Sequence, residues 1–597
     1  MLFYRFDFLK NKLFSYKLTE LLDNIEKVLK ENIEIVIEKQ RKRKGFYWSS
    51  TNFKREYVLK ESRESLQKKE RIKRGDIVSN ILNDDLIGTS KSYFSGALRF
   101  MLVGLLVLIQ FALILLLTYW LSESTIYIYM LIEIGSIFIT IGLVNDNRSP
   151  SFKLGWICIV LILPITGHIM YALWGKTGSK KKIEKKVLAK LNHGNQYYHY
   201  NPELAQEYEK KYPTKSRMSR YLESQQFPLF KNNHISYYPM GEDVFEAIFK
   251  DIQKAEKFIL INFFIIADGV LWRKIHELLL GKIKEGVEVK FMYDDFGATL
   301  RTPKNFRRNL EAEGFQIGVF NPIHKYTDKL YMNYRSHQKI IVIDGNIGYT
   351  GGMNLADEYV NLVHRFGTWK DNAVRVEGDA IWGLTVTFLQ MWEICNPNQV
   401  IDYNLYRPTK VFKKNDVYCH VVSDGPVNHP NNPIENIYKQ IITYAKKFIY
   451  ITTPYLIIED DMKQALITAA KSGVDVRIIT PFIPDKKHVK ILTNYNYGRL
   501  LEGGVKIYEY TPGFIHAKTI INEDCGIIGT INMDYRSFYL HYECGLWMCN
   551  KDVIQVIKDD FLKTINESQE ISYIDWKNRP WQLKVYQPFL NLFSTLM

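Results

Sequence analysis

A histidine and a lysine two residues apart mark the first stretch of the chain that could do chemistry. His337 and Lys339 flank the start of the apolar run 340–344, and an extended strand would point both side chains to the same face. The loop that follows contains two glycines and ends at Asn354, so it can approach a ligand closely. An imidazole, an ammonium group and a carboxamide suit attack on a phosphate ester, which needs a nucleophile or base beside donors for the non-bridging oxygens.

The same pattern of residues occurs a second time. His516 and Lys518 again stand two residues apart, before an apolar run and a Gly-Thr-x-Asn turn that contains Thr530 and Asn532. One His-x-Lys pair arises easily by chance, but the segments around the two copies also match in the same order, which indicates an internal duplication. The matching segments are 255–266 and 445–457, 285–295 and 472–482, and 314–322 and 504–512.

The duplicated halves predict the fold class. Each half reads as strand, helix, strand, helix, strand and then the strand of the His-x-Lys motif, which is typical of an α/β domain whose mostly parallel sheet is covered by helices. We expect two such domains, at 236–400 and at 401–597. We interpret the charged, tyrosine-rich residues 176–235 as the connector that precedes them.

Each histidine needs a partner that sets its tautomer and supports its positive charge. The strand after the first Asn turn offers Asp371, and the corresponding strand after the second offers Glu543. We predict that one carboxylate pairs with each histidine; the alternative is that both are solvated at strand ends. Asp294 and Asp295 resemble a metal pair without a third ligand, so we interpret them as a strand-end turn, and we assign His541 no role.

The composition excludes some classes of protein and leaves others open. The 597 residues are 46% hydrophobic and 14% aromatic, which excludes a disordered chain and allows several domains. The formal net charge of +15 favours an anionic partner, for which nucleic acid and an anionic membrane surface fit equally well. The six cysteines form no CxxC pair and no cluster with zinc spacing, so we predict reduced cysteines without structural disulfides.

Three apolar segments follow a polar, basic region at 1–97 that contains no residues suggestive of chemistry. The first two are long enough to span a bilayer, and the third contains Pro164 and Gly167, which favour a kink. Three in a row predict a multi-pass protein of the cell membrane. Because basic residues flank both ends of the group, we consider a re-entrant path for one segment. The segments lie at 98–121, 126–144 and 154–174, within the region 98–175.

Dense local matches make the chain similar to a known family. From about residue 145 to the C-terminus it resembles the phospholipase D superfamily, and within it the bacterial cardiolipin synthases. The motifs that carry the resemblance are NRSPSFKLGW, LPITG, YALWG, YYPMGEDVFEA, MYDDFG, NYRSHQK, TPYLI, IPDKK, YEYTPGFIHAK and GTINMDYRSF.

The resemblance implies a fold and an activity. The expected fold is two phospholipase D-like α/β domains in a pseudo-twofold arrangement, preceded by transmembrane helices. The expected reaction transfers a phosphatidyl group between two phosphatidylglycerol molecules, giving cardiolipin and glycerol, without a metal or other cofactor. Phosphatidylglycerol and anionic membrane lipid are the implied partners, and no nucleic acid is expected.

The motif residues then acquire expected roles. By family analogy His337 is the nucleophile that forms a phosphohistidine intermediate, and His516 is the acid and base. In the absence of a metal, protein cations and amides must neutralise the charge that develops on the phosphate. The side chains expected to do so are Lys339, Lys518, Asn354 and Asn532.

The second motif departs from the family pattern, which places an aspartate five residues after the lysine. Asp344 follows Lys339 at this distance, but Glu523 stands at the corresponding position after Lys518, and the second loop is one residue shorter. Because this acidic residue in the family is generally a structural support away from the reacting phosphate, we expect activity to survive.

Other functions are open from the sequence. A membrane-bound phospholipase D hydrolase would use the same residues, with water in place of the second lipid. A nuclease of the same superfamily fits the basic chain, but a substrate in the bilayer explains the apolar segments and DNA does not. A non-enzymatic membrane scaffold is supported only by the altered second motif. The oligomeric state is open as well.

Overall fold

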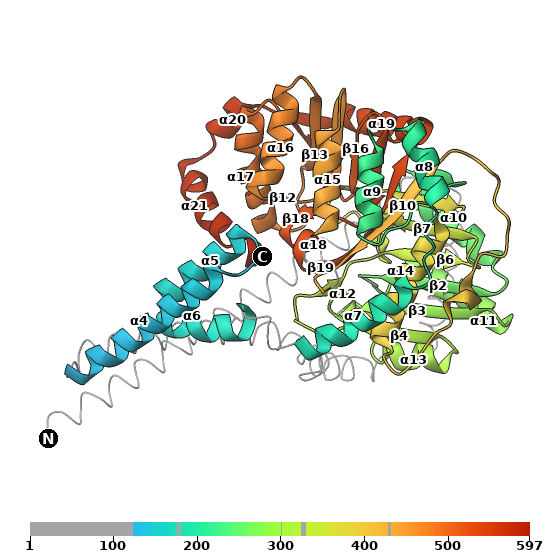
Figure 1. Ribbon diagram of the computed structural model, residues 1–597, viewed down its shortest axis with the longest axis horizontal. Coiled ribbons are helices and arrows are strands. Elements are labelled where there is room, and N and C mark those ends of the chain that lie inside the picture. The colour runs from blue at the N-terminus through green and yellow to red at the C-terminus, as the bar shows by residue number, and fades with distance from the viewer. Residues whose placement is uncertain (1–122, 176–180, 300, 324–329, 428–431, 597) are drawn as a thin grey trace, which may run out of the picture. The chain divides into compact units, whose positions relative to one another are not determined.

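Two β-sheets, one from each half of the duplication, lie side by side (Figure 1). The computed structural model describes residues 123–175, 181–299, 301–323, 330–427 and 432–596, which all fall within the compact unit Ser92–Met597. The polar region at 1–97 and the predicted apolar segment at 98–121 lie outside the described residues.

The first sheet has seven strands in the order β1-β9-β7-β6-β2-β3-β4. Its central strands are buried along their whole length, as in FILINF of β2 and IIVI of β6, because helices cover both faces. The strands are β1 (His234–Tyr238), β2 (Phe258–Phe263), β3 (Glu288–Asp294), β4 (Gln316–Phe320), β6 (Ile340–Ile343), β7 (Ile347–Gly351) and β9 (Ala373–Glu377). The helices are α10 (Gly241–Gln253), α11 (Val270–Lys284), α12 (Asp295–Ala298), α13 (Phe306–Ala312), η3 (Asp357–Val360) and α14 (Ile381–Cys395).

The second sheet repeats the plan with the order β10-β19-β17-β16-β11-β13-β14-β20. Its strands are β10 (Tyr418–Asp424), β11 (Phe448–Thr452), β13 (Asp475–Pro481), β14 (Lys506–Tyr510), β16 (Thr519–Ile521), β17 (Cys525–Gly529), β19 (His541–Cys549) and β20 (Ser568–Ile571). Its helices are α15 (Pro433–Thr443), α16 (Asp460–Lys471), α17 (Lys487–Glu502), α18 (Tyr535–Tyr539) and α19 (Lys551–Asn566). Two short strands, β12 (Leu456–Ile457) and β18 (Met533–Asp534), pair beside it.

The prediction of mostly parallel sheets is wrong. Along the strand order of the two large sheets, only β2, β3 and β4, and β11, β13 and β14, pair in parallel with their neighbours among the described residues. The strands β6 and β16, which follow the His-x-Lys motifs, pair antiparallel with both neighbours. The short turns that follow β6 and β16 explain their pairing with β7 and β17, because a loop of a few residues joins antiparallel strands, whereas a parallel connection needs a crossover of a dozen or more residues.

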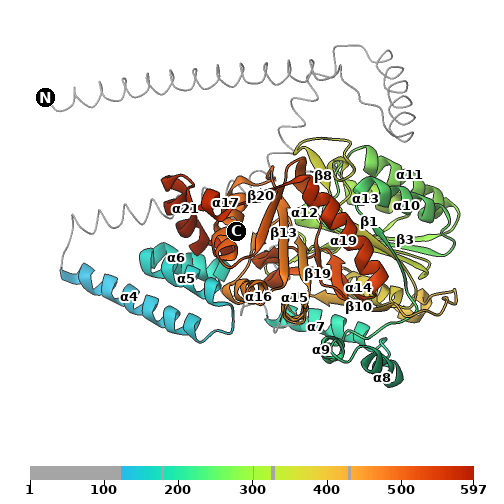
Figure 2. The same cartoon turned by 90° about the horizontal axis from the view of Figure 1, so that it is seen from above.

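The two halves interlock through two short parallel strand pairs. β5 (Arg335–Ser336), from the first half, pairs with β19 of the second. β15 (Gly513–Ile515), from the second half, pairs with β8 (Thr368–Lys370) of the first. The buried helix α14 lies at the junction and contacts both β6 and β10, so the two halves share a hydrophobic core (Figure 2). Each half therefore carries a strand that leads its own histidine into the other half.

The predicted apolar segment at 126–144 is the main part of helix α4 (Glu123–Val144). The segment at 154–174 is not one helix: α5 (Pro150–Ile162) ends at Leu163, and α6 (Pro164–Met170) and the π-helix η1 (Tyr171–Gly175) follow. Pro164 lacks the N–H group that would continue α5, and Gly167 lies so close to the Ile159 carbonyl that no side chain fits there. Across the described residues, no helix has the length and the hydropathy needed to cross a membrane.

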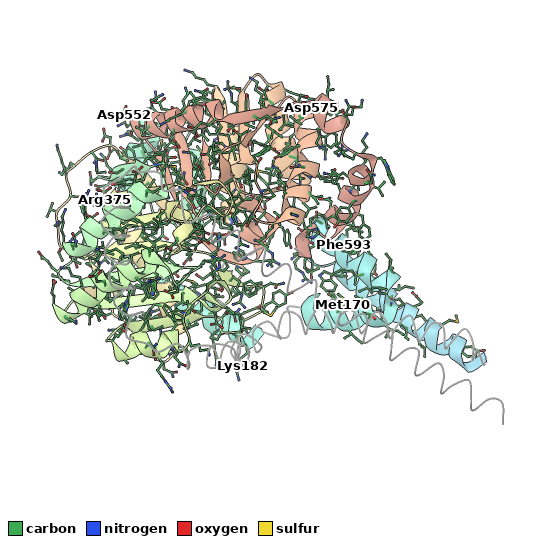
Figure 3. All side chains as sticks on the ribbon, turned by 180° about the vertical axis from the view of Figure 1, so that it is seen from behind. Met170, Lys182, Arg375, Asp552, Asp575 and Phe593 are labelled. Atoms are coloured by element: carbon green, nitrogen blue, oxygen red, sulfur yellow. The ribbon has the colours of Figure 1, made fainter. Side chains whose placement is uncertain are left out.

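Helix α5 packs against the second half through aromatic side chains. Phe152 stacks on Tyr535 of α18 with ring centroids 6.5 Å apart, and Trp156 belongs to the same cluster. Phe593, near the C-terminus, packs against this cluster, where Figure 3 shows it beside helix α5. The remaining elements are α7 (Lys181–Asn195), α8 (Pro202–Lys211), α9 (Ser216–Ser224), η4 (Tyr403–Tyr406), α20 (Tyr573–Lys577), α21 (Trp581–Leu592) and η5 (Ser594–Leu596).

Candidate active site

Both His-x-Lys motifs lie in the short segments that connect an interlocking strand to a sheet strand. His337 and Lys339 stand between β5 and β6, and His516 and Lys518 stand between β15 and β16. All four side chains are buried. Lys339 Nζ donates to the carbonyl oxygen of His337 at 2.6 Å, and Lys518 Nζ donates to the carbonyl oxygen of His516. Each lysine therefore turns back over the peptide of its own histidine.

A carboxylate from the second half holds the histidine of the first. His337 Nδ1 lies 2.9 Å and 3.0 Å from the two carboxylate oxygens of Glu543. The register explains the meeting, because Ser336 of β5 pairs with Tyr542 of β19, and the next residues along the two parallel strands are His337 and Glu543.

A carboxylate from the first half holds the histidine of the second in the same way. His516 Nδ1 lies 2.6 Å from Asp371 Oδ2. Ile515 of β15 pairs with Lys370 of β8, so the next residues are His516 and Asp371. The two imidazole–carboxylate pairs are present as the sequence predicts, and the alternative of two solvated carboxylates is wrong, since Asp371 and Glu543 have no exposed surface. Both pairs cross between the halves.

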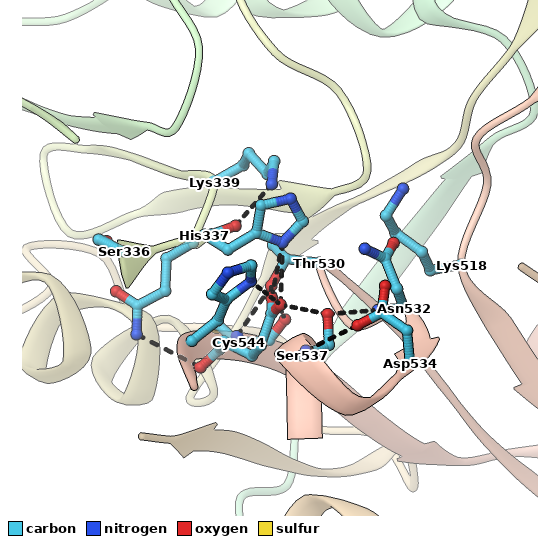
Figure 4. A network of polar contacts seen from close by, with 12 residues as sticks. Ser336, His337, Lys339, Lys518, Thr530, Asn532, Asp534, Ser537 and Cys544 are labelled. Carbon is cyan, nitrogen blue, oxygen red and sulfur yellow. Dashed lines mark hydrogen bonds and ion pairs between the residues drawn. The ribbon is translucent and has the colours of Figure 1, made fainter. Parts of the chain in front are cut away.

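Glu543 is the centre of a buried hydrogen-bond network, in which Figure 4 labels its partners His337, Thr530 and Ser537. The hydroxyl of Ser537 donates to Oε1 at 2.7 Å, and the hydroxyl of Thr530 donates to Oε2. The backbone N–H of Asn532 in turn donates to the Ser537 hydroxyl at 3.2 Å. The Gly-Thr-x-Asn turn therefore supplies both a support for the carboxylate and the Asn532 side chain, which lies beside Lys518 in Figure 4.

The charges of the two motifs influence one another. Burial first, then Lys518 and Lys339, hold the pKa of His516 well below its usual range. Burial also lowers the pKa of Lys518 to about 8, against the attraction of Asp371 and Glu543. Since groups from both halves act on the same side chains, the two motifs form one site.

The two carboxylates differ in ionisation. Burial raises the pKa of Asp371 to about 7, with Lys518 opposing the change. Burial also disfavours the charged form of Glu543, but the interactions of this carboxylate with His337 outweigh burial and lower the pKa of Glu543. Burial and Lys339 hold the pKa of His337 well below its usual range, although Glu543 opposes them.

The two asparagines are placed differently from each other. Asn354 Oδ1 accepts the backbone N–H of Ile265 at 3.0 Å, and its Nδ2 donates to the Tyr359 hydroxyl at 2.7 Å. Asn354 thus braces the loop around the site and keeps one amide hydrogen for a ligand. Asn532 Oδ1 is buried without a hydrogen-bond partner among the described residues, so this carboxamide is the freer of the two.

The acidic residues that follow the lysines lie away from the imidazoles. The Asp344 carboxylate accepts the backbone N–H groups of residues 256–258 at 2.8–2.9 Å, at the start of β2. Glu523 accepts those of Lys446 and Lys447 at 3.0 Å and 3.3 Å, at the start of β11. Because glutamate is longer by one methylene group, it reaches the equivalent backbone from the shorter loop.

His541, to which the sequence pattern assigns no role, lies in the site. Its ring centroid is 5.4 Å from that of His337, and its Nδ1 is 3.7 Å from Glu543 Oε1. His337, His541 and Glu543 place one possible metal-ligand atom each within 4.8 Å of one another, a cluster that the sequence does not reveal. A signal was present in the repeat: His541 stands two residues before Glu543, as Trp369 stands two residues before Asp371 and packs on His516 at 5.3 Å.

The pair Asp294 and Asp295 forms a strand-end turn, as predicted. Asp294 ends β3 and caps α12 by accepting the N–H groups of Phe296 and Gly297. Its other oxygen accepts the N–H of Ser336 at 3.0 Å, so it also anchors the strand that leads to His337.

The fold and the site define the class of the protein. Two mixed α/β halves, each with a His-x-Lys pair and each lending a carboxylate to the other, are the arrangement of a phospholipase D-type enzyme. Residues 248–392 and 438–565 match the family described as "Cardiolipin synthase, PLD-like domain", and residues 134–176 match "Phospholipase_D-nuclease N-terminal".

Similar proteins specify the family further. The cardiolipin synthase of Halalkalibacterium halodurans is 32% identical over 475 residues, which cover 78% of this chain and 93% of that protein. An uncharacterized protein of Streptococcus mutans is 39% identical over 445 residues, which cover 74% of this chain and 94% of that protein. The chain belongs to the cardiolipin synthase family of phospholipase D-like proteins.

A solved structure shares the fold. The phosphatidylserine synthase of Haemophilus influenzae superposes with a TM-score of 0.50 at 13% identity, over 64% of this chain and all of that chain. At this identity the similarity concerns the fold alone.

Proposed function

We propose that this chain transfers a phosphatidyl group from one phosphatidylglycerol to another, giving cardiolipin and releasing glycerol. The observation that carries the proposal is that each of two buried histidines contacts a carboxylate of the other half, His337 contacting Glu543 and His516 contacting Asp371. A buried lysine follows each histidine. An imidazole with one nitrogen held by a carboxylate presents the other as a nucleophile or base. Family membership supplies the substrate class.

In the first step, His337 attacks phosphorus and a phosphorus–nitrogen bond forms. The bond from phosphorus to the glycerol oxygen breaks, and His516 gives its proton to that oxygen, because an alkoxide is a poor leaving group. Glycerol leaves, and the phosphatidyl group remains on His337. Glu543 supports the positive charge that the substituted imidazole carries.

In the second step, His516 takes the proton from a hydroxyl group of the second phosphatidylglycerol. The oxygen attacks phosphorus, the bond to His337 breaks and cardiolipin is released. Lys339, Lys518 and Asn532 stabilise the negative charge that develops on the non-bridging oxygens in both steps. The proton balance closes, because the proton that His516 gives to glycerol is replaced by the proton that it takes from the second phosphatidylglycerol. The negative charge of the bound phosphodiester favours the protonated imidazole that the first step needs.

The acidic residues of the motifs have structural roles in this proposal. Asp344 and Glu523 hold the backbone at the starts of β2 and β11 and do not contact the substrate. Asn354 positions the loop through Tyr359. The active unit is formed by the two halves at 236–400 and 401–597, because each half completes the other's histidine.

We also propose that the chain is attached to the cell membrane as a multi-pass protein, through the segments within 98–175. Large apolar side chains of α4 support this proposal because they are exposed: Tyr127, Met130, Leu131, Ile134, Ile137, Phe138 and Ile141. Such a face is unusual on a soluble protein and suits contact with lipid. A substrate embedded in the bilayer requires an enzyme at its surface.

The test is to incubate the full chain, solubilised in detergent, with radiolabelled phosphatidylglycerol and to identify the products. We expect cardiolipin and glycerol in equal amounts. Phosphatidic acid in place of cardiolipin would show a hydrolase that uses water as the acceptor. Absence of turnover, in a preparation whose secondary structure and melting are intact, would contradict both reactions.

A further inference from the structure

The C-terminal helix α21 presents large apolar side chains to the outside along one stripe. Trp581, Val585 and Phe589 are 70%, 65% and 62% exposed, respectively. They are spaced four residues apart, so they lie above one another on the same face of the helix. A contiguous exposed patch of this kind marks an interaction surface.

The inward face of α21 contains a buried polar side chain. Gln587 is buried there beside Leu590. Both ends of its carboxamide are used, because Nε2 donates to the carbonyl oxygen of Ile491 at 3.2 Å and Oε1 accepts from Arg579 Nε at 2.7 Å. A helix that buries a glutamine and exposes a tryptophan and a phenylalanine is oriented for an apolar medium on its outer side.

The surroundings of α21 indicate which medium this is. The helix packs against α5 (Figure 1), whose outward residues Leu154, Leu161 and Ile162 are also exposed and apolar, so the apolar surface continues into the helices that we propose to attach the chain to the membrane. Exposed Lys584 lies on α21 next to the stripe, and exposed Lys577 ends the preceding helix α20. Aromatic and aliphatic side chains on one face with lysines beside them are typical of helices that lie in the surface of an anionic bilayer.

We propose that α21 lies in the headgroup region of an anionic bilayer, with Trp581, Val585 and Phe589 inserted toward the acyl chains. A second copy of this chain is the less fitting occupant, because Lys584 lies beside the stripe and would meet its own counterpart in a symmetric contact. The proposal deepens the proposed function, on which it rests for the choice of lipid.

The position of α21 connects this surface to the candidate active site. The hydroxyl oxygen of Tyr586 on α21 lies 3.4 Å from Nδ1 of His488 at the start of α17. Just before α17, Asp485 accepts the Tyr455 hydroxyl at 2.6 Å, in a pocket that Phe514 also lines. The Phe514 ring centroid lies 5.8 Å from that of His516. Lipid contact at α21 would therefore hold the bilayer next to the segment that borders the acid and base histidine.

Site-specific fluorescence tests the contact directly. Val585→Cys in the full chain, labelled with an environment-sensitive dye and reconstituted into phosphatidylglycerol-containing vesicles, should be quenched by lipids that carry a nitroxide on the acyl chain. The matched control is Val556→Cys on α19, a valine of similar exposure at 54%, which should be quenched little. Equal, weak quenching at both positions would overturn the proposal. So would protection of the Val585→Cys label by a second copy, detected as cross-linking between two α21 helices.

Measurements of transfer on vesicles and in micelles distinguish the role of α21 from the proposed function. Val585→Glu should lower transfer on vesicles by about tenfold, equivalent to about 1.4 kcal/mol of lost interaction, and should leave transfer in detergent–lipid micelles within about twofold. Val556→Glu should change neither rate. An unchanged vesicle rate for Val585→Glu would contradict the role of α21. If the wild-type chain shows no transfer at all, the proposed function fails while the quenching experiment still decides the lipid contact.

Discussion

The two His-x-Lys motifs occupy equivalent places in their halves, but different side chains support them. Asp344 accepts three backbone N–H groups in the first half, and Glu523 accepts two in the second. After the next strand, Gly352 leaves room for Asp371, which lies where a side chain would be, whereas Thr530 in the corresponding place donates to Glu543. The duplication therefore preserves the backbone positions and changes the chemistry around each carboxylate.

This difference suits a division of labour. Glu543 accepts from two hydroxyl groups in addition to His337, and a carboxylate with more donors stays ionised more readily. Glu543 therefore favours a positive charge on His337, which this imidazole acquires when it bonds to phosphorus. Asp371, with its pKa raised to about 7, favours an imidazole that takes up and releases protons. We therefore keep His337 as the proposed nucleophile.

The largest effects should come from the histidines themselves. His337→Ala and His516→Ala should each lower transfer by roughly 10²–10⁴-fold, because the nucleophile or the acid is lost. With a nitrophenyl phosphatidyl substrate, whose leaving group needs no proton, His516→Ala should form a phosphatidyl adduct on His337 and stall.

Mass spectrometry of the trapped protein locates the adduct. An adduct on His516 in the His337→Ala protein would reverse the assignment of the two halves. Near-normal turnover in both variants would contradict the mechanism as a whole.

Substitutions of the two carboxylates should affect different chemical steps, the formation of the adduct and its transfer to the acceptor. Glu543→Gln should slow adduct formation by about 10²-fold, since the charge that supports His337 is removed. Asp371→Asn should leave the burst of nitrophenol close to normal and slow the steady state, because His516, the base for the second step, loses the carboxylate that supports its protonated form. Rapid-quench kinetics checks both variants. Identical burst kinetics in the two variants would remove the proposed asymmetry.

The lysine of the second motif predicts a pH dependence. A lysine is charged below its pKa, and burial lowers that of Lys518 to about 8, so kcat/KM should fall as the pH rises through about 8. Lys518→Arg keeps the charge at every accessible pH and should flatten this alkaline decline, even if the overall rate is lower. A decline that persists unchanged in the arginine variant would assign it to another group.

The acidic supports should affect stability more than catalysis. Asp344→Asn should lower the free energy of unfolding by about 1–3 kcal/mol, because backbone N–H groups at the start of β2 lose a charged acceptor. Glu523→Gln should cost less, since Glu523 accepts fewer and longer hydrogen bonds. Thermal melting compares the two variants. A larger loss of stability for Glu523→Gln would contradict the comparison.

The smallest effect should come from chelation. We expect EDTA to leave transfer unchanged, because Lys339 and Lys518 provide the positive charge at the phosphate. Steady-state rates before and after dialysis against EDTA check this expectation. Loss of activity that Zn²⁺ or Mn²⁺ restores would instead give the cluster of His337, His541 and Glu543 a metal-binding role.

The repeated chemistry can be read from the amino-acid sequence. Two matched sets of segments indicate the duplication, and the position of each acidic residue within the repeat selects Asp371 and Glu543 as the partners of the two histidines. This succeeds because residues that share a place in a duplicated fold share their local backbone. The same reasoning places Glu523 in the role of Asp344, despite the shorter loop.

Which groups meet depends instead on the tertiary structure. Asp371 belongs to the half of His337 but pairs with His516, because β15 crosses to β8 and β5 crosses to β19. His541 enters the site for the same reason. The sheets are also mixed rather than mostly parallel, whereas the break of the segment 154–174 at Pro164 is predicted by the proline itself. Hydrophobic periodicity predicts that a strand or helix is buried. The direction of a strand and the strand that it pairs with depend on contacts between residues far apart in the chain.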